Sequence, residues 1–262
     1  MTQSTRPQLR AALARVTTVE SLTPHMTRVT LSAPEFADLV YLASDHFVRL
    51  LLPRASQIEP ELPKGEHWWP EMVAMPPERR PILRNYTVSG IRPESAEMDI
   101  DFVVHGDSGP ATRWVNRATA GDAVGVIDQG VVHEVRADAA EYLIVGDETA
   151  LPAATGLLSV MPPGTPVTAL LEVPAADDRR ELASTQARVH YFVRHDAHQQ
   201  PGVLLLDAVR DWQPTHDPVV AWVAGESTMT TAVRRFLVKA GVPKADISFH
   251  GYFKFGRSQY GD

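Results

Sequence analysis

The first half of the chain alternates apolar and polar residues over short runs, a pattern typical of strands with one buried face. The runs are rich in Val and Thr, and polar turn residues separate them. Six short strands with turn signals between them favour an antiparallel barrel. One helix over residues 110–118 interrupts the pattern and begins with Gly109-Pro110, a common helix start. The predicted strands span residues 11–20, 27–33, 46–52, 85–91, 98–105 and 123–128.

A long proline-rich stretch, residues 53–81, separates the third and fourth predicted strands and contains Trp68 and Trp69. Loops of this length inside a domain are usually functional or disordered. The stretch is therefore either a lid or a disordered edge.

The second half alternates short apolar strands with helical stretches. This order is typical of a parallel sheet covered by helices, as in Rossmann-like domains. The pattern changes near Asp138, so we predict a six-stranded barrel domain over residues 8–138 and an α/β domain over 139–262. The predicted strands are 142–145, 167–173, 189–193, 219–224 and 247–249, and the helices are 153–160, 203–212 and 228–240.

The charge balance argues against one large class of function. The chain has 25 basic and 32 acidic residues, a net charge of −7, and a pI near 5.8. Proteins that bind nucleic acid over a broad surface need clustered Lys and Arg, so we expect no nucleic-acid partner. A small anionic ligand is compatible with this balance, because it needs only a few basic residues in one pocket.

The chain contains no cysteine, which excludes disulfides, thiolate metal sites, iron–sulfur clusters and a cysteine nucleophile. His195 and His198 form a close pair, but their polar surroundings favour a solvated loop, and we expect no metal site. Any redox chemistry must therefore use a bound cofactor.

The sequence shows no pattern of a secretion signal or a membrane helix. Its first ten residues are polar, and the uncharged run over residues 149–171 contains four prolines. A transmembrane helix would not carry that many breaks. We expect a cytoplasmic protein without membrane insertion.

Arg84-Asn85-Tyr86-Thr87 fits the Arg-x-Tyr-Thr/Ser signature of ferredoxin reductase-like flavoenzymes, whose layout is a barrel followed by a nucleotide-type α/β domain. Alternation along a strand places Arg84 and Tyr86 on one side. Arg84 can pair with the FAD pyrophosphate through its planar fork, and Tyr86 can stack on the isoalloxazine ring. Thr87 can hydrogen bond to the flavin N5 edge. Alternatively, Tyr86 is ordinary barrel core and Arg84 is a surface charge.

The segment over residues 105–114 places Gly106 and Gly109 just before a helix start. Free backbone N–H groups at the positive end of a helix bind anions such as a pyrophosphate. Thr112 can add a hydroxyl donor. The alternative is a simple turn before a short helix.

Several segments together resemble the siderophore-interacting protein family, which includes bacterial ferric-siderophore reductases. They occur in family order and at family-like spacing from about residue 10 to the C-terminus. The Asp-Glu-Thr-Ala-Leu-Pro run from Asp147 and the His-Gly run from His105 are more specific than the short Arg84 signature. The matching segments are residues 84–87, 101–106, 109–114, 146–153, 222–226 and 251–256.

The resemblance implies an FAD-binding barrel followed by a Rossmann-like, NAD(P)H-type domain, with FAD held between the two. His105 is either a flavin contact or a structural histidine, and Asp147 is either a cofactor contact or the cap of a helix start. The residues that match the family's cofactor contacts are Arg84, Asn85, Tyr86, Thr87, Val103, His105, Gly109, Ala111, Thr112, Trp114, Asp147, Thr149 and Ala150.

The turn over residues 146–153 matches the place where related reductases receive the nicotinamide. It follows the first strand of the α/β domain, and ligands bind at the carboxyl ends of such strands. Gly225 and Glu226, at the end of a later strand, are expected to face the same crevice. The chain departs from related sequences in having no typical GxGxxG fingerprint, and Tyr252-Phe253 replaces the usual Tyr-Trp pair.

Ferric siderophores are anionic or strongly polar oxygen chelates, so a pocket for them should carry fixed cations. The family uses a small basic cluster, and Arg49, Lys254 and Arg257 match its positions. Together these three would form an anion site in an otherwise acidic protein. Each of them, taken alone, is also explained as an ordinary surface charge.

We therefore expect an FAD-dependent oxidoreductase that reduces ferric siderophore and releases iron(II), with electrons from NAD(P)H or a ferredoxin. NAD(P)H delivers two electrons and iron(III) accepts one, and FAD can bridge that difference. No side chain has to act as a catalyst, because the flavin mediates electron transfer. The alternatives are a ferric-siderophore carrier without turnover and a flavin reductase with another acceptor.

Overall fold

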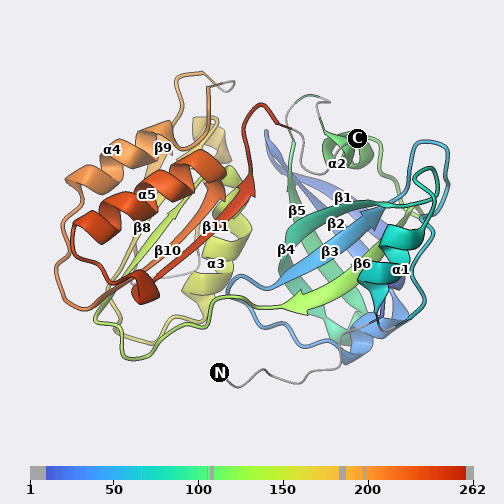
Figure 1. Cartoon of the computed structure of the whole chain (residues 1–262), viewed down its shortest axis with the longest axis horizontal. Coiled ribbons are helices and arrows are strands. Elements are labelled where there is room, and N and C mark those ends of the chain that lie inside the picture. The colour runs from blue at the N-terminus through green and yellow to red at the C-terminus, as the bar shows by residue number, and fades with distance from the viewer. Residues whose placement is uncertain are drawn as a thin grey trace. The chain divides into compact units, whose positions relative to one another are not determined.

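The computed structural model divides the chain into two units (Figure 1). It describes residues 10–65, 67–104, 106, 109–182, 187–196 and 199–257. The barrel unit comprises the chain up to Ser21 together with Thr27–Leu42 and His46–Val131, and the α/β unit comprises Leu22–Met26, Ala43–Asp45 and the chain from Val132 onward. The domain boundary between residues 138 and 139 stays a prediction.

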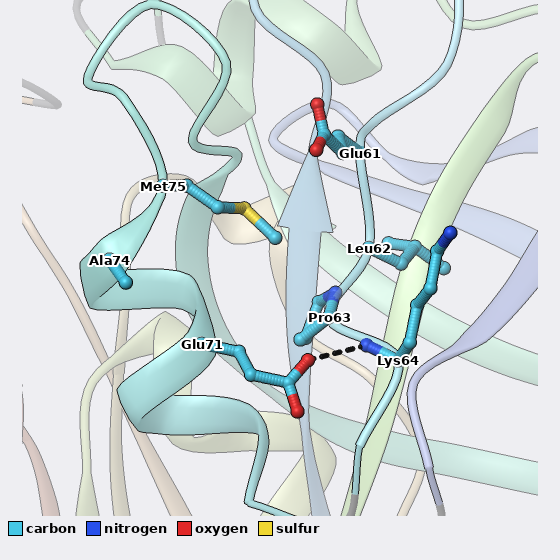
Figure 2. A pocket seen from close by; sticks show the side chains of 7 residues that line it. All are labelled: Glu61, Leu62, Pro63, Lys64, Glu71, Ala74 and Met75. Carbon is cyan, nitrogen blue, oxygen red and sulfur yellow. Dashed lines mark hydrogen bonds between the residues drawn. The ribbon is translucent and has the colours of Figure 1, made fainter.

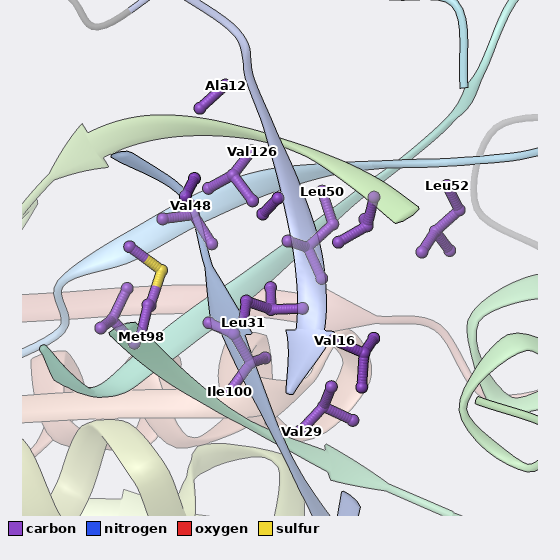
Figure 3. Close-up of a cluster of buried hydrophobic side chains, with 14 of the residues drawn as sticks. Ala12, Val16, Val29, Leu31, Val48, Leu50, Leu52, Met98, Ile100 and Val126 are labelled. Atoms are coloured by element: carbon purple, nitrogen blue, oxygen red, sulfur yellow. The ribbon is translucent and has the colours of Figure 1, made fainter. Parts of the chain in front are cut away.

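The barrel unit is a closed sheet of six strands in the order β1-β2-β5-β4-β3-β6, and the predicted antiparallel barrel is confirmed. Closure gives every strand two neighbours and leaves no sheet edge. Alternate side chains such as Val48, Leu50 and Ile100 point inward and form the core, part of which Figure 3 shows. The elements are β1 (Ala12–Thr23), β2 (Met26–Ser32), β3 (Phe47–Leu52), β4 (Ile82–Arg92), β5 (Glu97–Val103), β6 (Ala123–Gly130), α2 (Pro110–Val115), η1 (Pro34–Asp38) and η2 (Pro93–Ser95).

Residues 53–81, which we call the insertion, separate β3 from β4 and contain a helix that the sequence pattern did not predict, α1 (Trp68–Ala74). The guanidinium of Arg54 donates to the carbonyl of Arg80 at 2.7 Å. The guanidinium of Arg80 in turn donates to two carbonyls at and after the end of α1, at 2.6 and 2.9 Å. The described part of the insertion is therefore a hydrogen-bonded structure, and the interpretation as a disordered edge is wrong for it.

The α/β unit contains a five-stranded parallel sheet in the order β11-β10-β7-β8-β9, and the predicted Rossmann-like domain is confirmed. β7 and β10 are buried along their whole length, which explains why both are nearly continuous apolar runs. Helices α4 and α5 pack on one face through Leu205, Val209 and Val233. The elements are β7 (Glu141–Gly146), α3 (Leu151–Ser159), β8 (Val167–Val173), β9 (Ala187–Val193), α4 (Val203–Asp211), β10 (Val219–Glu226), α5 (Ser227–Lys239), β11 (Ile247–Phe253), η3 (Glu148–Ala150), η4 (Ala176–Asp178) and η5 (Lys244–Asp246).

The strand register brings several chain segments together at the carboxyl edge of this sheet. β7 and β10 are neighbours, with Gly146 opposite Ala224, so the turn after β7 lies beside the end of β10. β11 continues to pair with β10 as far as Phe253, beyond the predicted end at residue 249. Ligands of parallel α/β sheets bind at this edge, so its side chains are candidates for a binding site.

Candidate functional site

The flavin signature lies on β4, and its register with β3 decides where each side chain points. Tyr86 pairs with Val48, and Arg84 pairs with Leu50. Val48 and Leu50 are fully buried in the barrel core, and directly opposite residues of an antiparallel pair share one face of the sheet. Arg84 and Tyr86 therefore both lie on the inner side of β4, as the alternation predicts.

Tyr86 is held in place by a row of aromatic rings. Its ring centroid lies 4.3 Å from that of Phe102 on β5, and the Phe102 centroid lies 5.9 Å from that of Trp114 on α2. Burial raises the pKa of the Tyr86 phenol, and the charge of Arg84 opposes that effect. The phenol therefore stays neutral at physiological pH, and the ring presents a fixed aromatic surface close to a cation.

Gly109 is the N-cap of helix α2; it provides no side-chain cap, and its backbone is extended (φ −126°, ψ 155°). The first N–H groups of a helix have no partner inside the helix and can bind another acceptor. Among the described residues, a Cβ atom at Gly109 would approach only the hydroxyl of Thr112, at 3.8 Å, and one at Gly106 would have no contact within 4 Å. Because α2 has only six residues, these local donors matter more than any helix dipole.

These residues fit an FAD molecule. The pyrophosphate requires a cation and hydrogen-bond donors, which Arg84, the N–H groups after Gly109 and the hydroxyl of Thr112 can supply. The isoalloxazine ring requires a flat aromatic partner, which Tyr86 can supply. Of the other predicted contacts in this segment, Ala111 and Trp114 are buried, Val103 is half-buried, and His105 lies outside the described residues.

The other two residues of the signature point away from the core. Asn85 pairs with Arg49 and Thr87 pairs with Phe47, so these side chains belong to the outer face of the barrel. The guanidinium carbon of Arg49 lies 4.7 Å from the ring centroid of Trp68, which is a cation–π contact. The predicted residues of β3 and β4 are thus divided between two faces of the sheet.

In the α/β unit, the turn after β7 is organised by the buried carboxylate of Asp147. Its Oδ1 accepts the N–H of Thr149 at 3.0 Å and the hydroxyl of Thr149 at 2.5 Å, and its Oδ2 accepts the N–H of Glu226 at 2.7 Å. Burial and the neighbouring charge of Glu148 raise the pKa of Asp147. Asp147 therefore fixes the turn and joins it to β10. Thr149 is half-buried and Ala150 is buried. The role of Asp147, Thr149 and Ala150 as cofactor contacts stays a prediction.

Two glycines permit this close packing. The backbone of Gly225 has φ +125°, and a Cβ atom there would lie 2.3 Å from Asp147 Oδ2. A Cβ atom at Gly146 would lie 2.4 Å from the Cβ of Ala150. Both positions therefore require glycine because another chain segment fills the space of the side chain.

Glu226 is fully buried and serves as the N-cap of α5. Its Oε2 accepts the N–H groups of Thr228 and Met229 at 2.6 and 2.9 Å, and its Oε1 accepts the N–H of Phe255 at 3.2 Å. A carboxylate in this position stabilises the start of a helix. The predicted nicotinamide-side role of Gly225 and Glu226 stays a prediction, and in the structure this carboxylate already has backbone partners.

Sequence reasoning missed a buried ionic cluster at the carboxyl edge. Arg194, just after β9, donates two hydrogen bonds of 2.7 Å to Glu148 and one of 3.2 Å to Glu172. Glu172 also accepts the N–H of Gly202 at 2.8 Å, and burial raises its pKa. The sequence did contain a signal for this cluster. Acidic residues follow or end two neighbouring strands, β7 and β8, and an arginine follows the next strand, β9.

Lys254 and Arg257 lie on an exposed turn that follows β11. They form a β-bridge in which the N–H of Arg257 donates to the carbonyl of Lys254 at 3.0 Å, and Gly256 between them has φ +72°. The turn thus brings two predicted cations close together. Arg49 belongs to the barrel unit, and convergence of all three stays a prediction.

A shallow pocket lies on the insertion (Figure 2). The carboxylate of Glu71 on α1 closes one side of it and accepts the N–H of Lys64 at 2.8 Å and that of Gly65 at 3.1 Å. The lining residues are Glu61, Leu62, Pro63, Lys64, Glu71, Ala74 and Met75. All of them come from the insertion, and none was predicted as a site residue.

The described residues contain no helix that is long and apolar enough to cross a membrane. They also contain no group of three or more His, Cys, Asp or Glu side chains arranged to hold a metal ion. His198, one of the two histidines of the predicted polar loop, lies outside the described residues.

The closed barrel with its flavin signature and the parallel α/β unit define a flavoprotein of the ferredoxin reductase-like class, an FAD-dependent oxidoreductase. The ferredoxin NADP+ reductase of Neisseria gonorrhoeae shares this fold, with a TM-score of 0.64 at 13% identity over 94% of this chain and 100% of that one. Residues 15–133 match the model of the siderophore-interacting FAD-binding domain, and residues 139–256 match that of the siderophore-interacting protein. This chain belongs to the siderophore-interacting protein family.

Individual relatives agree with this assignment. A siderophore utilization protein from T. fusca has a TM-score of 0.82 and 32% identity, over 97% of this chain and 95% of that one. The ferric vibriobactin reductase of Vibrio cholerae is 28% identical over 81% of this chain and 78% of its own length. The mycobactin import ATP-binding/permease protein of Mycolicibacterium smegmatis is 30% identical over 94% of this chain, which spans only 26% of that longer protein.

Proposed function

We propose that this protein reduces ferric siderophores to release iron(II), with electrons from NAD(P)H or a ferredoxin, in the cytoplasm. The observation that carries the proposal is the FAD-compatible face of β4, which lies inside the segment 15–133 that matches the siderophore-interacting FAD-binding domain. The relative named ferric vibriobactin reductase supports the choice of a ferric siderophore as the substrate.

The electron count favours a flavin enzyme. One NAD(P)H carries a hydride, which is a proton with two electrons, and each iron(III) accepts one electron. Oxidation of one NAD(P)H therefore yields NAD(P)+, one proton and two iron(II) chelates. FAD, when bound, accepts electrons in pairs and releases them singly. Iron(II) carries less charge than iron(III), so an oxygen chelator holds it more weakly.

In this proposal the side chains of the protein bind and orient the cofactor and the chelate. Arg84 would hold the anionic pyrophosphate, and Tyr86, whose ring packs against Phe102, would orient the flavin. Lys254 and Arg257, exposed on one turn, are suited to attract an anionic chelate to a protein whose net charge is −7. Such local positive charge raises the association rate of anions and is weakened by salt.

An anaerobic experiment tests the proposal. The purified protein is loaded with FAD and mixed with NADH, NADPH or a reduced ferredoxin, and bleaching of the flavin absorbance identifies the donor. Ferric siderophore is then added in the presence of a ferrous trap. We expect flavin absorbance to return and two trapped iron(II) ions to form per NAD(P)H consumed.

Three results would contradict the proposal. A protein that does not take up FAD cannot be this enzyme. A protein that binds ferric siderophore without oxidising its flavin is a carrier. A protein whose reduced flavin is reoxidised by free flavin or quinone but not by ferric siderophore is a flavin reductase of another kind.

A further inference from the structure

The insertion is the part of the barrel unit that the proposed function leaves without a role. Ordering a stretch of this length costs conformational entropy, which its contacts must offset. Arg54 and Arg80 tie its two ends together through backbone carbonyls, and Glu71 binds two N–H groups within it. The central feature that these contacts hold in place is helix α1, which begins with Trp68.

Trp68 lies in a small apolar cluster on the outer face of the barrel. Its side chain is buried together with Leu51, Met72 and Ile127. Ile127 of β6 is the direct neighbour of Arg49 on one side. The indole therefore covers the part of the outer face from which the Arg49 side chain emerges, and the two meet at 4.7 Å.

Arg49 on β3 pairs with Asn85 on β4, the residue between Arg84 and Tyr86, so its backbone lies beside the flavin signature. Its side chain shares the outer face of the barrel with that of Asn85, whereas Arg84 and Tyr86 lie on the inner side. Arg49 is half-buried, so part of it is accessible to a ligand. A flexible guanidinium loses rotational freedom when it binds an anion, and stacking on a fixed indole removes much of that cost in advance.

We propose that Trp68 is a positioning residue that holds the Arg49 guanidinium ready for contact with an anionic ferric chelate. This inference rests on the proposed function, in which Arg49 contacts the substrate. The flat guanidinium fork suits chelators with paired oxygens, such as catecholates and carboxylates, because it can bind both oxygens at once. The insertion thus contributes to chelate affinity through Trp68, without contact between Trp68 and the chelate.

The test compares substitutions at two adjacent tryptophans. W68L removes the aromatic face and keeps an apolar side chain, and W68F keeps a smaller aromatic face. W69L is the matched control, because Trp69 lies on the same helix, is 48% exposed, and meets Trp68 edge-on at 5.5 Å. R49K keeps the charge but loses the planar group that stacks, and R49Q removes the charge.

The probes are the ferric and gallium(III) complexes of 2,3-dihydroxybenzoate, the second of which cannot be reduced by the flavin. We expect W68L and R49K to raise both KM for the ferric complex and Kd for the gallium complex by about three- to tenfold. In W68L, kcat and FAD content should stay unchanged. W68F should show a smaller rise, and W69L none. In the R49Q background W68L should raise KM and Kd no further, because the contact between the Arg49 guanidinium and the chelate is already lost.

Each other outcome has a defined meaning. If R49K and W68F both bind the gallium complex as tightly as the wild-type protein, the inference is wrong. If R49Q also binds normally, Arg49 is not a chelate contact and the inference falls with it. If the wild-type protein binds the gallium complex but reduces no ferric chelate, the proposed function fails while the binding comparison still tests the role of Trp68.

Discussion

The carboxylate of Asp147 occupies the space that a side chain at position 225 would need. A Cβ atom on Gly225 would lie 2.3 Å from Asp147 Oδ2, and the same oxygen accepts the N–H of Glu226 at 2.7 Å. Asp147 follows β7 and Gly225 lies near the end of β10, so this contact joins the carboxyl ends of two central strands. The turn after β7 is therefore tied to the end of β10 through Asp147.

The variant G225A should destabilise the protein strongly. We expect its free energy of unfolding to fall by roughly 2–4 kcal/mol, because the methyl group displaces a buried, hydrogen-bonded carboxylate and alanine is strained at φ +125°. Urea denaturation measures the loss. G241A is the control, since Gly241 has φ +103° with open space around it and should lose only about 1–2 kcal/mol through strain. Equal losses in the two variants would show that the contact with Asp147 has no energetic weight.

The variant R194M should be more damaging than substitutions of its partners. It leaves Glu148 and Glu172 buried without a cation, and we expect a loss of roughly 3–5 kcal/mol in the free energy of unfolding. E148Q should cost less, because Arg194 keeps Glu172. The double variant E148Q/R194M should lose less than the sum of the two single changes. The control R210M removes an exposed arginine of α4 whose partner, Asp207, is also exposed, and it should cost about 0–1 kcal/mol. An R194M protein as stable as that control would contradict the prediction.

The α/β unit should lose stability in mild acid because of His133 and His250. Burial lowers the pKa of both, the charge of Asp45 opposes this, and each histidine is close enough to Asp45 to be affected by it. A lowered pKa in the folded state means that the unfolded chain binds protons first as the pH falls. Stability attributable to this pair is therefore complete above the ordinary histidine pKa of about 6.5 and decreases as the pH drops from there towards the folded values.

Urea denaturation at about pH 7.5 and 5.5 measures that effect. We expect H250Q to reduce the difference in stability between the two conditions relative to the wild-type protein. H190Q is the matched control, because His190 is an exposed residue of β9 in the same unit. A wild-type protein that is equally stable at both pH values, or an H250Q protein with an unchanged difference, would count against the role of the pair.

The variant R84K should bind FAD more weakly although it keeps the charge. Lysine cannot form two parallel hydrogen bonds with a pyrophosphate, so we expect roughly ten- to hundredfold lower affinity. Quenching of flavin fluorescence during titration of the cofactor-free protein measures it. Y86F is the control, since it keeps the ring that packs against Phe102 and should change the affinity only slightly. Unchanged binding by R84K would remove Arg84 from the cofactor site.

Much of the fold could be predicted because it depends on local patterns. Alternation along short runs revealed the barrel strands, and apolar runs followed by helical stretches revealed the parallel sheet. Helix α1 was missed because it is short and lies among prolines, so that its stability depends on packing of Trp68 and Met72 against the barrel. The predicted start of β4, residue 85, was three residues too late, because pairing with β3 extends the strand back to Ile82, opposite Leu52.

The sequence by itself determined the two kinds of unit, the family and the identity of the flavin signature, because each of these is written in residues that lie close together along the chain. Only the tertiary structure decided where the charged groups at the carboxyl edge go. Arg194 is 46 residues from Glu148 and 22 from Glu172, and no local pattern says which of them it will meet. The same holds for Arg49 and Trp68, because a stacking contact depends on where two strands and an insertion bring their side chains in space.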